Sequence, residues 1–125
     1  MEIFHPEGWP KPAVPLSHAA KAGDWIYVSG QVAQNHDGTP FIGDFAKEVN
    51  GAIDSVEAVL KAAGASLENV VKLNCFLSNG VLFSEFNKIY GERITAGPPA
   101  RTTTVTGFGN ANVRVEIDAI AYVGE

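Results

Sequence analysis

The stretch FAKEVNGAIDSVEAVLKAA, residues 45–63, gives the clearest structural signal in this chain of 125 residues. Its apolar side chains recur at intervals of three and four, so they line one side of an amphipathic helix. Asp44 directly before it can cap the first turn, and Gly64 directly after it can end the last turn. The sequence therefore predicts a helix over residues 45–63 with a buried stripe of Phe45, Val49, Ala52, Ile53, Val56, Val59, Leu60 and Ala63.

Segments on either side of this helix have the composition of strands. Residues 25–29 are aromatic and β-branched, and residues 69–77 form a mostly apolar run that is typical of a buried strand. Two further strands are predicted at residues 101–106 and 113–123. In the last one, apolar residues alternate with charged ones, so one face of the strand should contact the core while the other points outward.

The remaining segments complete a simple order of elements. A second helix is predicted at residues 80–93, and Pro98-Pro99 ends anything helical before it. Residues 1–15 hold four of the seven prolines and should form an extended arm. Gly30 is expected to end the first strand, and Asn35-His36-Asp37-Gly38 is typical of a hairpin turn. The order predicts an α+β fold with two helices packed on one face of a mostly antiparallel sheet. The expected inner face of the second helix is Leu82, Phe83, Phe86, Ile89 and Tyr90.

The composition is that of one globular domain, residues 1–125, with 46% hydrophobic and 18% charged residues. A domain this small leaves apolar surface uncovered, so we expect self-association. A net charge of −5 without a run of Lys or Arg argues against a nucleic-acid groove. The chain shows neither a signal peptide at Met1–Pro6 nor an apolar run near the roughly 20 residues of a membrane span. These features predict a cytoplasmic protein without membrane or nucleic-acid partners.

The sequence offers no pattern for a metal, a cofactor or a covalent nucleophile. His5, His18 and His36 lack the spacing of zinc ligands, and no phosphate-binding loop or nucleophile elbow is present. The single cysteine, Cys75, lies inside an apolar strand, which favours a buried structural thiol over a reactive one. We therefore predict a site that uses neither metal nor cofactor.

Two charged residues are candidates for chemistry. Arg101 opens a strand after Pro98-Pro99-Ala100, where its planar guanidinium could hold a carboxylate through two parallel hydrogen bonds. Glu116 lies on the polar face of the last strand. The pattern alone also allows a surface arginine, and a solvent-facing glutamate or one paired with Arg114 or Arg101.

Six short motifs occur in order between about residues 12 and 123: Ser17-His18-Ala19, Ser29-Gly30-Gln31, Val71-Lys72, Phe86-Asn87-x-x-Tyr90, Pro99-Ala100-Arg101 and Val115-Glu116-Ile117-x-Ala119-Ile120-Ala121. The most specific feature is the pairing of Pro-x-Arg with Glu116 and Ile117, fifteen and sixteen positions after the arginine. With these motifs, nearly the whole chain resembles the Rid (YjgF) family of reactive-intermediate imine and enamine deaminases, also called the L-PSP endoribonuclease family.

The resemblance implies a fold, an assembly and an activity. The fold is chorismate-mutase-like, and three copies form a homotrimer with a cleft between each pair of subunits. The activity is hydrolysis of 2-imino and enamine acids to a 2-keto acid and ammonia, without cofactor or metal. By resemblance, Arg101 binds the substrate carboxylate and Glu116 positions the water. The other positions matching the cleft are Leu16, Ser29, Gly30, Asn87 and Thr103.

Several positions depart from the pattern of the family. Leu16 stands where a tyrosine is common, Thr103 where many members have Cys or Ser, and Glu48 at a helix position that is often Gln. Gly109-Asn110 replaces a usual Leu-Pro. The more hydrophobic pocket at Leu16 suits a larger unsaturated enamine acid such as 2-aminomuconate. The sequence also allows a non-catalytic trimer that binds 2-keto acids and, against the charge, a ribonuclease.

Overall fold

The computed structural model describes residues 1–95 and 97–124, and its centre is one mixed sheet of six strands. The strands lie in the order β1-β2-β3-β6-β4-β5, and all neighbours are antiparallel except β4 and β5, which are parallel. Their bounds are β1 Glu2–Phe4, β2 Ala19–Ala22, β3 Trp25–Gln31, β4 Val70–Leu77, β5 Ala100–Val105 and β6 Val115–Tyr122.

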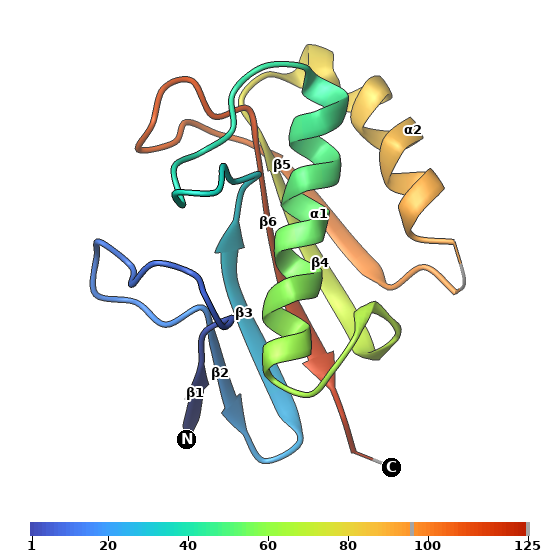
Figure 1. The fold of residues 1–125 in the computed structure, drawn as a ribbon. Helices are drawn as coiled ribbons and strands as arrows, with labels where there is room; N and C mark the ends of the chain where they lie inside the picture. The colour runs from blue at the N-terminus through green and yellow to red at the C-terminus, as the bar shows by residue number, and fades with distance from the viewer. Residues whose placement is uncertain (96, 125) are drawn as a thin grey trace.

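Two helices cover one face of this sheet (Figure 1). Helix α1 spans Phe45–Ala62 and lies against β3 and β6, while α2, Phe83–Arg93, packs beside α1. Short 3₁₀ turns, η1 at Leu67–Asn69 and η2 at Gly80–Leu82, flank β4. The predicted α+β class, with two helices on a mostly antiparallel sheet, is confirmed.

The ends of α1 are formed as the sequence predicts. The Asp44 side chain accepts a hydrogen bond from the backbone N–H of Lys47 at 3.1 Å, which satisfies a free donor of the first turn. Gly64 adopts a φ of 82°, a left-handed conformation that glycine takes without strain. The helix itself ends at Ala62, one residue before the predicted end.

The structure corrects the predictions for the N-terminal third. The proline-rich arm contains β1, and β2 is a further strand that the sequence does not predict, because three alanines and a lysine carry no periodic signal. Gly30 does not end its strand, since β3 continues through a bulge to Gln31. The turn at residues 35–38 closes only an isolated bridge between Gln34 and Pro40, not a hairpin between two strands.

The second helix also differs in part from its prediction. The first residues of the predicted range, Gly80–Leu82, form the 3₁₀ turn η2 instead of an α-helical turn. Phe86, Ile89 and Tyr90 are buried as expected, but Phe83 is 45% exposed. Helix α2 begins at Phe83. The ring of Phe83 lies beside Arg101 on the edge strand β5 rather than in the core.

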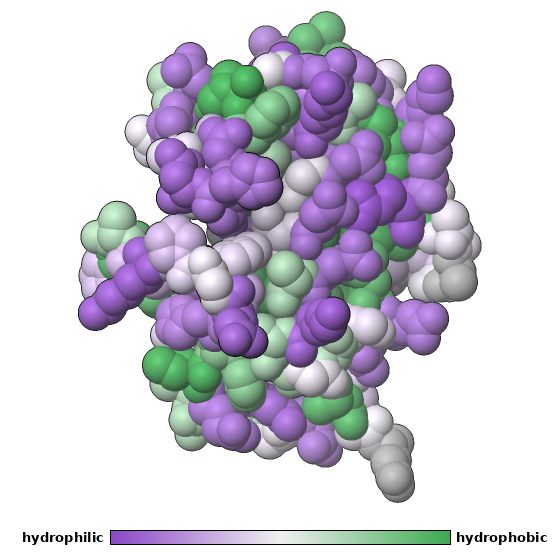
Figure 2. Space-filling view, in the orientation of Figure 1, coloured by the Kyte–Doolittle hydropathy of each residue, from purple (hydrophilic) through white to green (hydrophobic). Residues whose placement is uncertain are grey.

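Alternation along the strands divides the sheet into a helix-covered face and an open face. In β6, Val115, Ile117 and the two alanines that follow at alternate positions are buried, whereas Glu116 and Asp118 are half-buried on the other side. Trp25 and Tyr27 of β3 are exposed. The outer surface on the helix side is largely hydrophilic (Figure 2). In the described part of the chain, no helix combines the length and apolar character that crossing a bilayer requires.

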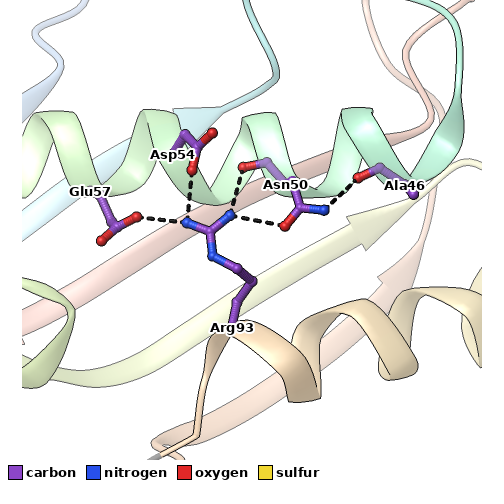
Figure 3. Close-up of polar contacts among 5 residues, drawn as sticks. All are labelled: Ala46, Asn50, Asp54, Glu57 and Arg93. Carbon is purple, nitrogen blue, oxygen red and sulfur yellow. Dashed lines mark hydrogen bonds and ion pairs between the residues drawn. The ribbon is translucent and has the colours of Figure 1, made fainter.

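Arg93 at the end of α2 ties the two helices together. Its Nη1 donates to the backbone oxygen and to the Oδ1 of Asn50, at 3.2 and 2.9 Å. Its Nη2 donates to Asp54 and Glu57, at 2.7 and 2.6 Å. Figure 3 shows the guanidinium lying between these three residues of α1. Arg93 therefore ties the last turn of α2 to α1, in addition to the core contacts between the two helices.

Replacing Arg93 with Met should lower the free energy of unfolding by about 1–2 kcal/mol, because charge-assisted hydrogen bonds to Asn50 are lost while the exposed ion pairs contribute little. Urea denaturation measures the difference. The matched control is Lys88→Met on an exposed position of the same helix, which should change stability by less than about 0.5 kcal/mol. Equal stability of the two variants would contradict the role given to Arg93.

Candidate active site

Arg101 lies in β5 on the helix-covered side of the sheet. It pairs in register with Leu73 of β4, which is buried in the core, and residues paired across neighbouring strands share a face. The guanidinium carbon is 4.8 Å from the ring centre of Tyr90, 5.6 Å from that of Phe86 and 5.8 Å from that of Phe83. The charge of Arg101 thus sits among aromatic rings of α2.

Three buried polar atoms, two on α2 and one on β5, make no hydrogen bond with a described residue: Asn87 Oδ1, Tyr90 OH and Thr103 Oγ1. Thr103 pairs with buried Cys75, so it faces the same side of the sheet as Arg101. Buried polar atoms are almost always hydrogen-bonded, and an unsatisfied one costs about 1–3 kcal/mol. A cation with an unused hydroxyl donor on the same face of its strand is the arrangement expected where a small anion binds.

Glu116 lies on the opposite face of the sheet. It pairs in register with Phe76, whose side chain points away from its buried neighbours Cys75 and Leu77. An added Cβ at Gly30 would stand 2.5 Å from Glu116 Oε2, so only glycine leaves this carboxylate its present position. Burial, and secondarily the nearby Asp118 carboxylate, raise the pKa of Glu116 above its ordinary value. A raised pKa makes the ionised carboxylate a stronger base towards a water molecule.

The backbone beside Glu116 is held by the segment that precedes β2. Ser29 Oγ donates to the backbone oxygen of Ser17 at 2.7 Å, and the Ser29 N–H donates to that of His18 at 2.9 Å. Buried Gln31 donates through its amide to the backbone oxygen of Ser29 at 3.1 Å. Leu16, next to this segment, is 44% exposed. Sequence reasoning misses Gln31 as a support of the site, although this residue ends the Ser-Gly-Gln motif.

The predicted site residues therefore form two groups that do not meet within one chain. Arg101, Asn87 and Thr103 gather on the helix-covered side, and Glu116 lies with Gly30 on the open side. A recess of about 620 Å³ between the N-terminal segment and α1 is lined by residues of neither group. A cleft that uses both groups needs a second chain.

Glu116 forms neither of the ion pairs that the sequence pattern allows. Arg114 instead pairs with Glu48 of α1, whose carboxylate is buried, and its guanidinium lies 5.2 Å from the ring centre of Phe45. None of the ion pairs in the described part of the chain involves Arg101. The sequence pattern could not separate these partners, because it does not give the register of β6 against α1.

Cys75 is fully buried in β4, and burial raises the pKa of its thiol to about 12. It is therefore protonated at neutral pH and unsuited to nucleophilic attack, as expected for a structural thiol. Among residues 1–95 and 97–124, no group of three or more His, Cys, Asp or Glu side chains could hold a metal ion.

Comparisons with known proteins show the family to which the chain belongs. The family model described as Endoribonuclease L-PSP matches residues 7–123. The chain belongs to this family. It is 32% identical over 124 residues to the 3-aminoacrylate deaminase RutC of Acinetobacter baylyi, covering 98% of both chains. It is 33% identical to a 2-iminobutanoate/2-iminopropanoate deaminase of Dermatophagoides farinae, covering 91% of this chain and 90% of that one.

The fold of this L-PSP family member is shared with a solved structure. The YjgF gene product of E. coli superposes with a TM-score of 0.89 at 28% identity, covering 99% of this chain and 100% of the other. The Rid or YjgF resemblance predicted from the motifs is confirmed. Two of the relatives are named as deaminases, which supports a deaminase role for the family.

Proposed function

We propose that this L-PSP family member is a cofactor-free hydrolase that converts 2-imino and enamine acids to 2-keto acids and ammonia. The observation that carries the proposal is the environment of Arg101: its guanidinium forms no ion pair with a described residue, and the buried Thr103 hydroxyl on the same face of β5 makes no hydrogen bond with one. A substrate carboxylate could accept two parallel hydrogen bonds from this guanidinium, and such bonds are stronger than neutral ones. The deaminases among its relatives supply the reaction class.

In the proposed reaction, Glu116 acts on water. Its carboxylate accepts a proton as the water oxygen bonds to the C=N carbon, and the proton then passes to the nitrogen. The resulting carbinolamine loses ammonia and leaves the 2-keto acid. An enamine first takes a proton at carbon and loses one from nitrogen, which converts it to the imine. Because imines hydrolyse readily in water, positioning of the two reactants supplies much of the needed acceleration.

We further propose that the site forms between copies of the chain in a homotrimer, with Arg101 from one subunit and Glu116 from the next. The two residues lie on opposite faces of one sheet, so a ring of subunits can bring the helix-covered side of one edge against the open face of a neighbour. The open face carries exposed Trp25 and Tyr27, which suits an interface. Leu16, Ser29 and Gly30 would then line the Glu116 side of each cleft. A cytoplasmic location stays a prediction.

Two alternatives share the same anion site. Exposed Leu16 provides an apolar wall that favours a larger unsaturated enamine acid such as 2-aminomuconate. Arg101, which makes no ion pair with a described residue, would equally serve a trimer that binds 2-keto acids without turnover. A ribonuclease, which the family description names, is disfavoured by the net charge of −5.

Hydrolysis of 2-iminopropanoate tests the proposal. An amino-acid oxidase generates the imine, and semicarbazide traps what is not hydrolysed. The purified protein should lower the amount trapped, in proportion to its concentration. Unchanged trapping with 2-iminopropanoate but turnover of 2-aminomuconate would select the larger substrate. Binding of pyruvate without turnover of either compound would select the non-catalytic protein.

The acid limb of the pH profile of kcat/KM should reflect the ionisation of Glu116. Only the ionised carboxylate accepts a proton, so kcat/KM should rise with pH through the raised pKa of Glu116 and fall below it. Asp118→Asn removes a negative charge that raises this pKa, so the limb should move to lower pH. Profiles of both proteins, measured by the trapping assay, provide the comparison. A limb that stays in place or moves to higher pH would contradict the assignment.

A further inference from the structure

The three arginines of the chain are stabilised in different ways. Arg93 pairs with Asp54 and Glu57, and Arg114 pairs with Glu48. Arg101 has no ion pair with a described residue, although it is half-buried. A half-buried cation without an acidic partner needs another source of stabilisation, because removing it from water is costly.

Aromatic rings supply that stabilisation. The face of an aromatic ring is electronegative and attracts a guanidinium whose centre lies within about 6 Å, with a larger effect away from water. Phe83, Phe86 and Tyr90 all meet this distance, and Tyr90 is the nearest at 4.8 Å. Phe86 and Tyr90 are 0% and 7% exposed, and their ring centres lie 5.6 Å apart, so their positions are fixed by the core.

A ring holds a guanidinium without neutralising it. A carboxylate in the same place would occupy the N–H groups that a ligand needs and would repel an incoming anion. Burial raises the pKa of the Tyr90 hydroxyl to about 12, so this group carries no charge at neutral pH. Its oxygen makes no hydrogen bond with a described residue. The ring, and not the hydroxyl, is therefore the part of Tyr90 that acts on Arg101.

We propose that Tyr90 is a positioning residue whose ring, together with Phe86 and Phe83, forms an aromatic cage that fixes the Arg101 guanidinium and keeps its charge available for a ligand carboxylate. This proposal deepens the proposed function, since it explains how the carboxylate clamp is held. It assigns the selectivity for anions to α2 as well as to β5, and it gives a role to Phe86 and Tyr90 of the Phe-Asn-x-x-Tyr motif, of which the site assignment uses only Asn87.

Three variants of α2 separate the ring from the hydroxyl and from general packing. Tyr90→Leu removes the ring, Tyr90→Phe removes only the hydroxyl, and Ile89→Ala removes buried packing on the same helix outside the cage. The dissociation constant for pyruvate, measured by calorimetry, should rise about tenfold in Tyr90→Leu and stay within about twofold in Tyr90→Phe and Ile89→Ala. Thermal unfolding of each variant shows which effects on stability accompany these changes.

A second readout does not depend on the ligand or on turnover. In protein labelled with ¹⁵N-arginine, the Nε–H resonance of Arg101, identified by its absence in Arg101→Lys, should carry a ring-current shift. That shift should persist in Tyr90→Phe and Ile89→Ala and collapse in Tyr90→Leu.

Three results would overturn the cage. The first is an unshifted wild-type resonance, and the second is equal pyruvate affinity in Tyr90→Leu and wild type. The third is a loss in Tyr90→Phe as large as that in Tyr90→Leu, because the hydroxyl would then be the acting group. If the Arg101 Nε–H resonance shows the expected shifts but no imine is hydrolysed, the result supports the cage and contradicts only the proposed reaction.

Discussion

Arg101→Ala should lower kcat/KM for 2-iminopropanoate by about a hundredfold or more, because removing one partner of a desolvated, hydrogen-bonded charge pair costs about 2–5 kcal/mol. The loss should appear in pyruvate affinity as well, since both ligands present a carboxylate. Arg101→Lys keeps the charge but not the planar fork, so it should recover only part of the affinity. The trapping assay and calorimetry measure the two quantities.

Arg93→Met is the matched control for this prediction, because it removes an arginine that pairs with Asp54 and Glu57 and has no ligand role. It should lose stability and keep pyruvate affinity at working temperature. The reverse pattern is expected for Arg101→Ala, whose side chain has no ion pair with a described residue to lose. Wild-type pyruvate affinity in a folded Arg101→Ala protein would contradict the proposal that Arg101 binds the ligand carboxylate.

Gly30→Ala should lower kcat about a hundredfold while leaving the protein folded, since a displacement of a reacting group by about 1 Å can cost that much. An added Cβ would lie 2.5 Å from Glu116 Oε2 and 2.8 Å from its Cδ. The Glu116 carboxylate is the movable end of a side chain, so the overlap would be relieved by moving it rather than by unfolding. The backbone of Gly30 does not require a left-handed conformation, so alanine introduces no strain of its own.

Gly91→Ala is the matched control for this substitution. Gly91 lies in α2 with nothing within 4 Å of an added Cβ, so alanine there should raise stability by about 0.5–1 kcal/mol and leave kcat unchanged. Glu116→Gln, which keeps the shape and removes the base, should match or exceed the loss in Gly30→Ala. Full activity in Gly30→Ala would show that the position of Glu116 does not matter for turnover.

The elements whose apolar residues recur at a regular spacing could be predicted from the sequence. The stripe of α1 and its Asp44 cap, and the alternation in β6, are local patterns that tertiary contacts reinforce. The short strands β1 and β2 could not be predicted, since β2 is a strand only because β3 lies beside it, and β1 only because β2 does. An aromatic residue at helical spacing usually packs in the core, whereas Phe83 faces Arg101 at the sheet edge.

The sequence could predict the residues of the candidate site but not their arrangement in space. Motifs could single out Arg101 and Glu116, but which face each residue occupies depends on the register of β4 with β5 and β6. Without that register, an ion pair between Glu116 and an arginine is as consistent with the sequence as two separate half-sites. The contacts of Arg101 with the aromatic rings of α2 likewise depend on how α2 packs beside β5, and no spacing in the sequence encodes that packing.

Complementation between two inactive variants tests the central claim most directly. Arg101→Ala and Glu116→Ala are co-expressed with different tags, and trimers carrying both tags are isolated and assayed by imine trapping. If each cleft takes Arg101 from one subunit and Glu116 from the next, every such trimer holds one intact cleft. The isolated trimers should therefore recover about one third of wild-type activity.

The baseline comes from Arg101→Ala co-expressed with the double variant that carries both Arg101→Ala and Glu116→Ala. These trimers should be inactive because no subunit carries Arg101. Recovery to about one third of wild-type activity, well above this baseline, is the result that a shared site predicts. Activity of the mixed trimers no higher than the baseline would contradict a site shared between subunits.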